Sequence, residues 1–149
     1  MSSSSSPPEG APLIALFDES VAELEARSPM HLARTAEALA GRRVEVRVGR
    51  ARFAVEAARG SVRRTAPDLD APLAVEATDR QLLALLDGER DLTEAAKAGA
   101  LVLSGRLADL AAFHEALTAF LHGCVRASGS AARLERYRRS VLVERGGPG

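Results

Sequence analysis

The sequence contains no tryptophan, a single cysteine and no net charge. One cysteine, Cys124, excludes an internal disulfide, and the N-terminus lacks the basic and apolar regions of a secretory signal, so we expect a cytoplasmic location. Because 20 basic residues balance 20 acidic ones, the chain has no long-range field to attract nucleic acid, which we exclude as a partner. Uncharged runs fall far short of the ~20 apolar residues that cross a bilayer, so we expect no membrane-spanning segment.

The length and the apolar content are sufficient for one folded domain with short tails. With 149 residues and 46% hydrophobic side chains, the chain can bury a core of ordinary size. Residues 1–11 are mostly serine, proline and glycine, which predicts a disordered arm. We place the globular domain at 12–125, followed at 126–149 by an arginine-rich helix and a loose tail.

Alternation of apolar and polar side chains predicts an antiparallel meander of three strands. Residues 43–48 and 52–56 both have the period of two that half-buried strands show, and Gly49-Arg50 between them is a tight-turn signal. A weaker third strand is expected at 61–66. A fourth follows the proline-rich loop, at 73–77.

Apolar residues at three- and four-residue spacing predict helices around this sheet. The expected helices begin near Pro12, Pro29, Leu82, Asp91, Leu107 and Ser130, and Thr78 with Gln81 forms a capping-box pattern before the helix at 82–86. The longest has its expected apolar stripe at Leu107, Leu110, Phe113, Leu117, Phe120, Leu121 and Cys124. The apolar run 100–104 is too short for a helix and predicts a fifth strand, buried on both faces. Helices packed over one sheet define an α+β fold.

Four segments between Val44 and Leu121 have a recognisable pattern, namely VEVRVGRARFAVEAARG, AVEATD, LLALLDGERDLTEAAKAG and LVLSGRLADLAAFHEAL. Together they resemble the sterol carrier protein 2 family. The resemblance implies a five-stranded mixed sheet with helices on one face, enclosing an apolar tunnel. It also implies a non-catalytic intracellular protein that binds or transfers a sterol, a fatty acyl chain or an isoprenoid.

The expected ligand-binding residues are apolar side chains on the inner face of the sheet and on the helices that cover it. They are Phe53, Val55, Leu73, Val75, Leu82, Leu86, Leu101, Leu103, Phe113, Leu117, Phe120 and Leu121. Such pockets are mostly apolar. The alternative interpretation is that each of these side chains is an ordinary core residue that contacts no ligand.

No catalytic or metal-binding pattern accompanies these residues. His114, His122 and Cys124 lack the further ligands of a metal site, so we expect neither a metal nor a cofactor. Ser104-Gly105 lacks the preceding glycine of a nucleophile elbow. Asp68 and Asp70 could be read as paired carboxylates, but turn formation is the favoured role. We predict no enzyme activity.

The last helix has a narrow apolar stripe of Leu134, Tyr137 and Val141. Beside this stripe lie several arginines, including Arg133, Arg136 and Arg139. They could contact an anionic membrane or an acidic protein, although a solvated face with a Glu135–Arg139 pair is the simpler interpretation. If they bind membranes, replacing all three with glutamine should abolish binding to anionic vesicles. A second functional hypothesis makes the domain an assembly module whose apolar groove binds a partner protein, and a third makes it an enzyme that uses His114 or His122.

Overall fold

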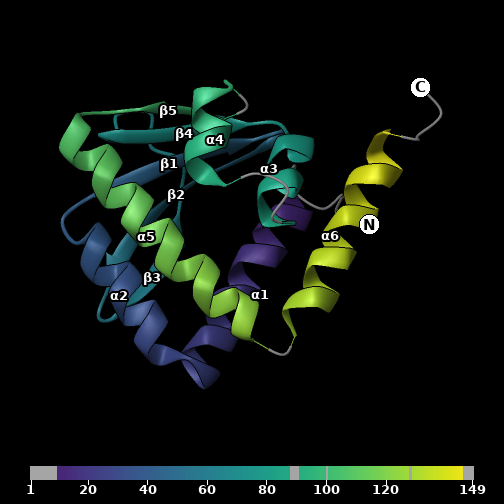
Figure 1. The fold of residues 1–149 in the computed structure, drawn as a ribbon, viewed down its shortest axis with the longest axis horizontal. Coiled ribbons are helices and arrows are strands. Elements are labelled where there is room, and N and C mark those ends of the chain that lie inside the picture. Colours follow the sequence, from purple (N-terminus) through teal and green to yellow (C-terminus); the bar gives the residue numbers. More distant parts are fainter. Residues whose placement is uncertain (1–9, 88–90, 100, 128, 146–149) are drawn as a thin grey trace, which may run out of the picture.

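A five-stranded mixed sheet with helices on one face forms the core of the computed structural model, which describes residues 10–87, 91–99, 101–127 and 129–145 (Figure 1). The strands are β1 (Arg43–Val48), β2 (Ala51–Ala58), β3 (Ser61–Thr65), β4 (Leu73–Ala77) and β5 (Val102–Ser104). The helices are α1 (Ala11–Arg27), α2 (Pro29–Leu39), α3 (Asp79–Leu86), α4 (Leu92–Lys97), α5 (Leu107–Arg126) and α6 (Ser130–Arg145). The predicted α+β class is confirmed.

The order of strands in the sheet is β3-β2-β1-β4-β5. β1, β2 and β3 pair antiparallel, as the predicted meander requires, and Gly49 turns the first hairpin with a φ of 58°. β4 then pairs parallel with β1, and β5 pairs antiparallel with β4. The sheet is therefore mixed, with β1 at its centre.

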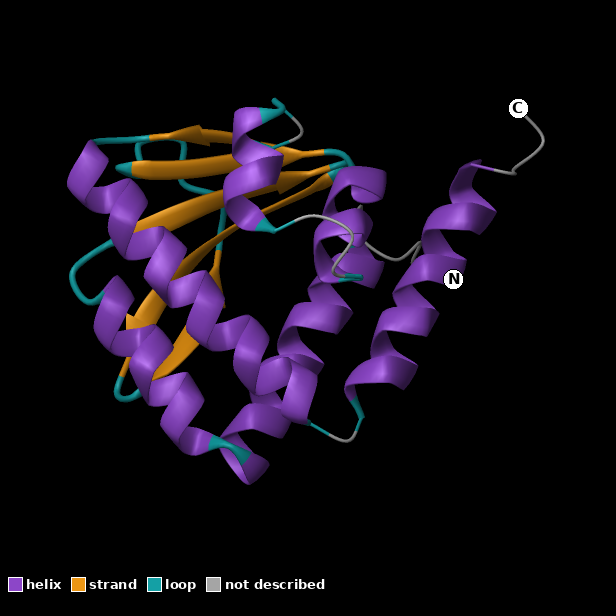
Figure 2. Cartoon of the chain, in the orientation of Figure 1, coloured by secondary structure: helices purple, strands orange, loops and turns teal. Residues whose placement is uncertain are grey.

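The two faces of the sheet differ in chemistry, because successive side chains of a strand point to opposite sides. On the helix-covered face, Val46 of β1 lies between Phe53 of β2 and Val75 of β4. Charged side chains such as Arg43 and Arg47 occupy the other face, which no described helix covers (Figure 2). An apolar interior can form on one side only.

Helices α1, α2 and α5 form most of the layer that covers one face of the sheet (Figure 1). α5 crosses α2 closely, since a Cβ atom on Gly123 would lie 2.9 Å from both His31 Cβ and a methyl carbon of Leu24. α3 begins with the predicted capping box, in which Gln81 N–H donates to Thr78 Oγ1 at 3.1 Å and Thr78 N–H donates to Gln81 Oε1 at 2.8 Å. None of the described helices is long and apolar enough to cross a membrane.

Three details of the sequence interpretation are wrong. β5 is an edge strand rather than one buried on both faces, and Val102 is 50% exposed. The prediction failed because the short apolar run 100–104 does not indicate which strands lie beside it. Leu107, expected on the apolar stripe of α5, is 83% exposed at the first turn of that helix. α1 begins at Ala11, inside the arm predicted for 1–11, while residues 1–9 of that arm lie outside the described residues.

Candidate ligand pocket

An apolar pocket of about 210 Å³ lies between the helix-covered face of the sheet and helices α1, α2, α3, α5 and α6. All four phenylalanines of the chain line it. The Phe17 ring lies 5.7 Å from the Phe53 ring and 5.9 Å from the Phe120 ring, measured between centroids. These contacts join α1, β2 and α5 across the pocket, and ring pairs at such distances are favourable.

Ten of the twelve residues expected to bind the ligand line this pocket. They are Phe53, Val55, Val75, Leu82, Leu86, Leu101, Phe113, Leu117, Phe120 and Leu121. The other two lie outside its wall. Leu73 is 1% exposed and packs at the Gly105 turn, where its Cδ2 would lie 2.9 Å from a Cβ added to that glycine. Leu103 is half-buried on the edge strand β5.

The wall also contains residues that the sequence interpretation did not assign to it. They are Leu13, Leu16, Phe17, Ser20, Thr35, Leu39, Val44, Val46, Val48, Val62, Leu85, Ala116, Cys124, Ser130 and Leu134. Two groups of these residues could have been assigned to the wall from the sequence. The valines of β1 share the period of two with Phe53 and Val55, and the α1 residues belong to the apolar stripe of an amphipathic helix, so both must face the interior.

The polar side chains of Thr35, Ser20 and Cys124 in the wall have hydrogen-bond partners within the protein. The Thr35 hydroxyl donates to the His31 carbonyl at 2.8 Å. Burial raises the pKa of the Cys124 thiol to about 11, although the nearby positive charge of Arg133 and a hydrogen bond with Ser20 act in the opposite direction. Among the described residues, no aspartate, glutamate, histidine, lysine or arginine lines the pocket. The described part of the wall is suited to apolar contact.

Helix α6 closes one end of the pocket and is held there by polar contacts with α1 and α3. It contributes Ser130 and Leu134 to the wall. Arg136 Nη1 donates to Glu19 of α1 at 2.8 Å, and the Tyr137 hydroxyl donates to Asp79 of α3 at 2.5 Å. Further ion pairs are Arg133–Glu23, Arg138–Asp87 and the expected Glu135–Arg139 pair, the last at 3.2 Å. The arginines that the sequence offered for a membrane contact thus have intramolecular partners.

Comparison with solved structures shows what this arrangement is similar to. A crystal structure of sterol carrier protein 2 aligns with a TM-score of 0.54 at 17% identity, over 76% of this chain and 96% of that one. "UbiJ-SCP2 Ubiquinone synthesis protein" aligns with a TM-score of 0.53 at 23% identity, over 74% of this chain and 93% of that one.

The chain has the fold of sterol carrier protein 2. No protein-family model and no curated protein matches the sequence. The chain also aligns with 13% of a much longer sec-alkylsulfatase from Pseudomonas sp., over 53% of its own length, with a TM-score of 0.42 and 20% identity. At identities this low the sterol carrier protein 2 fold is shared, and the expected mixed sheet with helices on one face is confirmed.

The other sequence candidates do not form a site on this sterol carrier protein 2 fold. His114 and His122 are exposed on α5, and no group of three potential metal ligands occurs among the described residues. Asp68 Oδ1 accepts the backbone N–H of Asp70 at 3.0 Å, which is the turn-forming role that the sequence favours.

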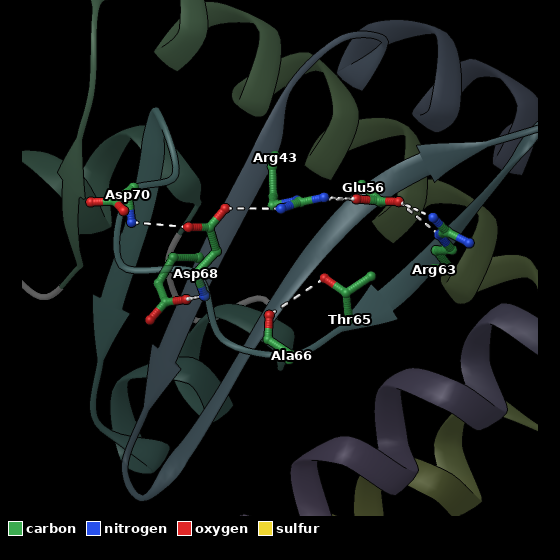
Figure 3. Close-up of polar contacts among 8 residues, drawn as sticks. Arg43, Glu56, Arg63, Thr65, Ala66, Asp68 and Asp70 are labelled. Atoms are coloured by element: carbon green, nitrogen blue, oxygen red, sulfur yellow. Dashed lines mark hydrogen bonds and ion pairs between the residues drawn. The ribbon is translucent and has the colours of Figure 1, made fainter.

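Asp68 also belongs to an ionic network on the helix-free face, in which Arg43 lies between Glu56 and Asp68 (Figure 3). Arg43 Nε donates to Glu56 at 3.0 Å and Nη1 donates to Asp68 at 3.0 Å. Hydrogen bonds from Arg43 are the largest cause of the lowered pKa of both carboxyl groups, with Arg63 as a further donor to Glu56. The network fastens the loop after β3 to the sheet.

Replacing Arg43 with glutamine should make the protein less sensitive to acid. A carboxyl group with a lowered pKa in the folded state stabilises the protein above its unfolded pKa, near pH 4, and this contribution disappears as the pH falls through the folded value. Urea unfolding at pH 6 and pH 3 should therefore show a smaller stability loss for Arg43→Gln than for the parent. Arg52→Gln is the control, because Arg52 is exposed and has no ion pair within the described part of the chain. Equal acid losses in all three proteins would contradict the assignment.

Proposed function

We propose that this protein binds an apolar ligand, such as a fatty acyl chain, a sterol or an isoprenoid, in the pocket under α5, and that it carries the ligand without reacting with it. The observation that supports this most is the apolar pocket of about 210 Å³ in the middle of the fold. Protein interiors are normally packed to the density of organic crystals. A dry apolar cavity of about 150 Å³ is already large enough to bind benzene in another protein.

Apolar contact can supply a large share of the free energy of such binding. Burying ~300 Å² of ligand surface at ~25 cal/mol/Å² yields about 7 kcal/mol before the entropy of association is subtracted. A dissociation constant of 1 μM requires about 8.2 kcal/mol, so a ligand that binds this tightly must bury more apolar surface than this or add a polar contact. The shared fold with sterol carrier protein 2 supports the same class of ligand.

The chemistry of the wall favours a carrier over an enzyme. Among the described residues, Cys124 is the titratable side chain that lines the pocket, and its raised pKa keeps it a protonated thiol, which is a poor nucleophile. His114 and His122 point to solvent on the outside of α5 and so are poorly placed to act on a bound chain. We therefore retain the non-catalytic function.

Native mass spectrometry of gently purified protein, followed by solvent extraction, tests the proposal. We expect a stoichiometric apolar lipid on a monomer. Phe113→Asp should release that lipid, because a carboxylate would enter the apolar wall. His114→Asp is the matched control, since it adds the same charge at the next, exposed position of α5. An apo dimer that takes up no fatty acid, sterol or isoprenoid would contradict the proposal and favour the assembly module.

A further inference from the structure

Arg133 of α6 is a buried arginine with two donor atoms that nothing in the described structure satisfies. Its side chain is 10% exposed, and its Nη1 pairs with Glu23 of α1. Nε and Nη2 are both buried, and neither has a hydrogen-bond partner among the described residues. Buried polar groups are nearly always paired, so these two donors indicate an acceptor that the protein does not itself provide.

The geometry of these two donors specifies the acceptor. Nε and Nη2 form one edge of the planar guanidinium, and their two N–H bonds run parallel. A carboxylate presents two oxygens at the matching spacing and accepts both bonds at once, whereas a hydroxyl or ketone offers one oxygen for two donors. The unpaired edge of Arg133 therefore has the form of a carboxylate site.

Arg133 lies near the end of the apolar pocket that α6 closes, although it does not itself line the wall. Ser130 and Leu134, on either side of Arg133 along α6, both line the pocket. The charge of Arg133 also acts on Cys124, a third residue of the same wall. Ser20, which is hydrogen-bonded to Cys124, is a further polar residue of the wall. A ligand with its chain among the phenylalanines could therefore place its polar end near Arg133.

The local charge balance permits one anion. Glu23 is shared between Arg133 and Arg27, whose Nε lies 3.8 Å from the Glu23 carboxylate. Two positive groups and one negative group leave an excess of one positive charge. A carboxylate neutralises that charge, while a phosphate monoester, with a charge near −2, exceeds it.

We propose that Arg133 binds the carboxylate of an amphiphilic ligand whose apolar chain fills the pocket, so that the preferred ligands are long-chain carboxylic acids. The inference rests on the proposed function and adds a residue that selects the ligand. Because α6 supplies both Arg133 and part of the pocket wall, the same helix closes the pocket and recognises the end of the ligand.

Calorimetry with dodecanoic acid and with dodecanol, two probes of equal chain length, tests the inference at pH 7.5. The parent protein should bind the acid about tenfold more tightly than the alcohol, because charge-assisted bidentate hydrogen bonds are strong in a buried site. Arg133→Lys keeps a positive charge near Glu23 but lacks the paired donors. It should lose most of this preference and keep the affinity for dodecanol.

Two further variants separate ligand recognition from a structural role of Arg133. Arg136 lies one turn after Arg133 on α6, and its side chain is 65% exposed. The variant Arg136→Lys should therefore keep the preference for the acid. Glu23→Gln removes a competing carboxylate and should increase the preference. In the parent, the Arg133 Nε proton resonance should move downfield with the acid and stay unchanged with the alcohol.

Equal affinity of the parent protein for the two probes, with no shift of the Arg133 resonance, would overturn the inference and leave the proposed function intact. Absence of binding by both probes would overturn the proposed function, and the carboxylate site with it.

Discussion

An Ala116→Phe variant is expected to remain folded and to lose apolar ligands. Ala116 is 2% exposed in the middle of α5, and its methyl group lines the pocket. A phenylalanine there would occupy space that the ligand needs. If the ligand loses ~150 Å² of buried surface, its affinity should fall by about 4 kcal/mol, which is between 100-fold and 1,000-fold. Native mass spectrometry with added dodecanoic acid measures the loss.

The stability of this variant distinguishes an open pocket from a packed core. Adding a large side chain to a close-packed core costs about 1–3 kcal/mol, whereas filling an existing cavity restores contacts. We expect Ala116→Phe to unfold within about 1 kcal/mol of the parent in urea. Ala111→Phe, on the exposed side of the same helix, should change neither stability nor binding. Full ligand occupancy of Ala116→Phe would place the ligand elsewhere.

Local periodicity was sufficient to predict most of the fold. The valines of β1 alternate strictly with charged residues, and the register of β1 with β2 follows from the two-residue turn at Gly49-Arg50. The predicted capping box at Thr78 is present for a similar reason, because a cap depends on residues three positions apart. Each of these features is decided by neighbours in the sequence.

Features that depend on distant partners could not be predicted in this way. Leu73 and Val75 follow the same alternation, yet only Val75 reaches the pocket, since the position of the helix layer above the sheet decides which apolar residues remain uncovered. The apolar run before Gly105 looks like an interior strand until the order of the strands is known. Sequence spacing indicates the inner face of each element but not what packs against it.

The last helix illustrates the same limit for charges. The sequence favoured a solvated face for the residues from Arg133 to Arg139, with an anionic partner as the alternative, because the acidic partners of Arg133 and Arg136 are remote in sequence. Glu19 and Glu23 precede the helix by more than 100 residues, as the hydrogen bond between Arg136 and Glu19 spans 117 positions. The narrow predicted stripe of Leu134, Tyr137 and Val141 was the available sign that one face of this helix is buried.

Tyr137→Ala is expected to destabilise the protein by about 3–4 kcal/mol, the largest stability loss that we predict. Tyr137 is 2% exposed where α6 meets α3, and its hydroxyl donates to Asp79. Removing a buried aromatic ring leaves a cavity, for which such losses are typical. The measurement is urea unfolding followed by circular dichroism.

Comparison with Tyr137→Phe separates the ring from the hydrogen bond. The phenylalanine keeps the packing and removes the donor to Asp79, so we expect a loss of about 1 kcal/mol. A larger stability loss for Tyr137→Ala than for Tyr137→Phe is expected if α6 belongs to the same folded unit as the sheet. The sequence had instead suggested a domain boundary at residue 125. A change below about 0.5 kcal/mol for Tyr137→Ala would match a surface position and would mean that α6 folds apart from the core. Leu134 and Ser130 of the pocket wall lie on the same helix as Tyr137. If Tyr137→Ala loses both stability and affinity for dodecanoic acid, the packing of Tyr137 holds α6 at the closed end of the pocket.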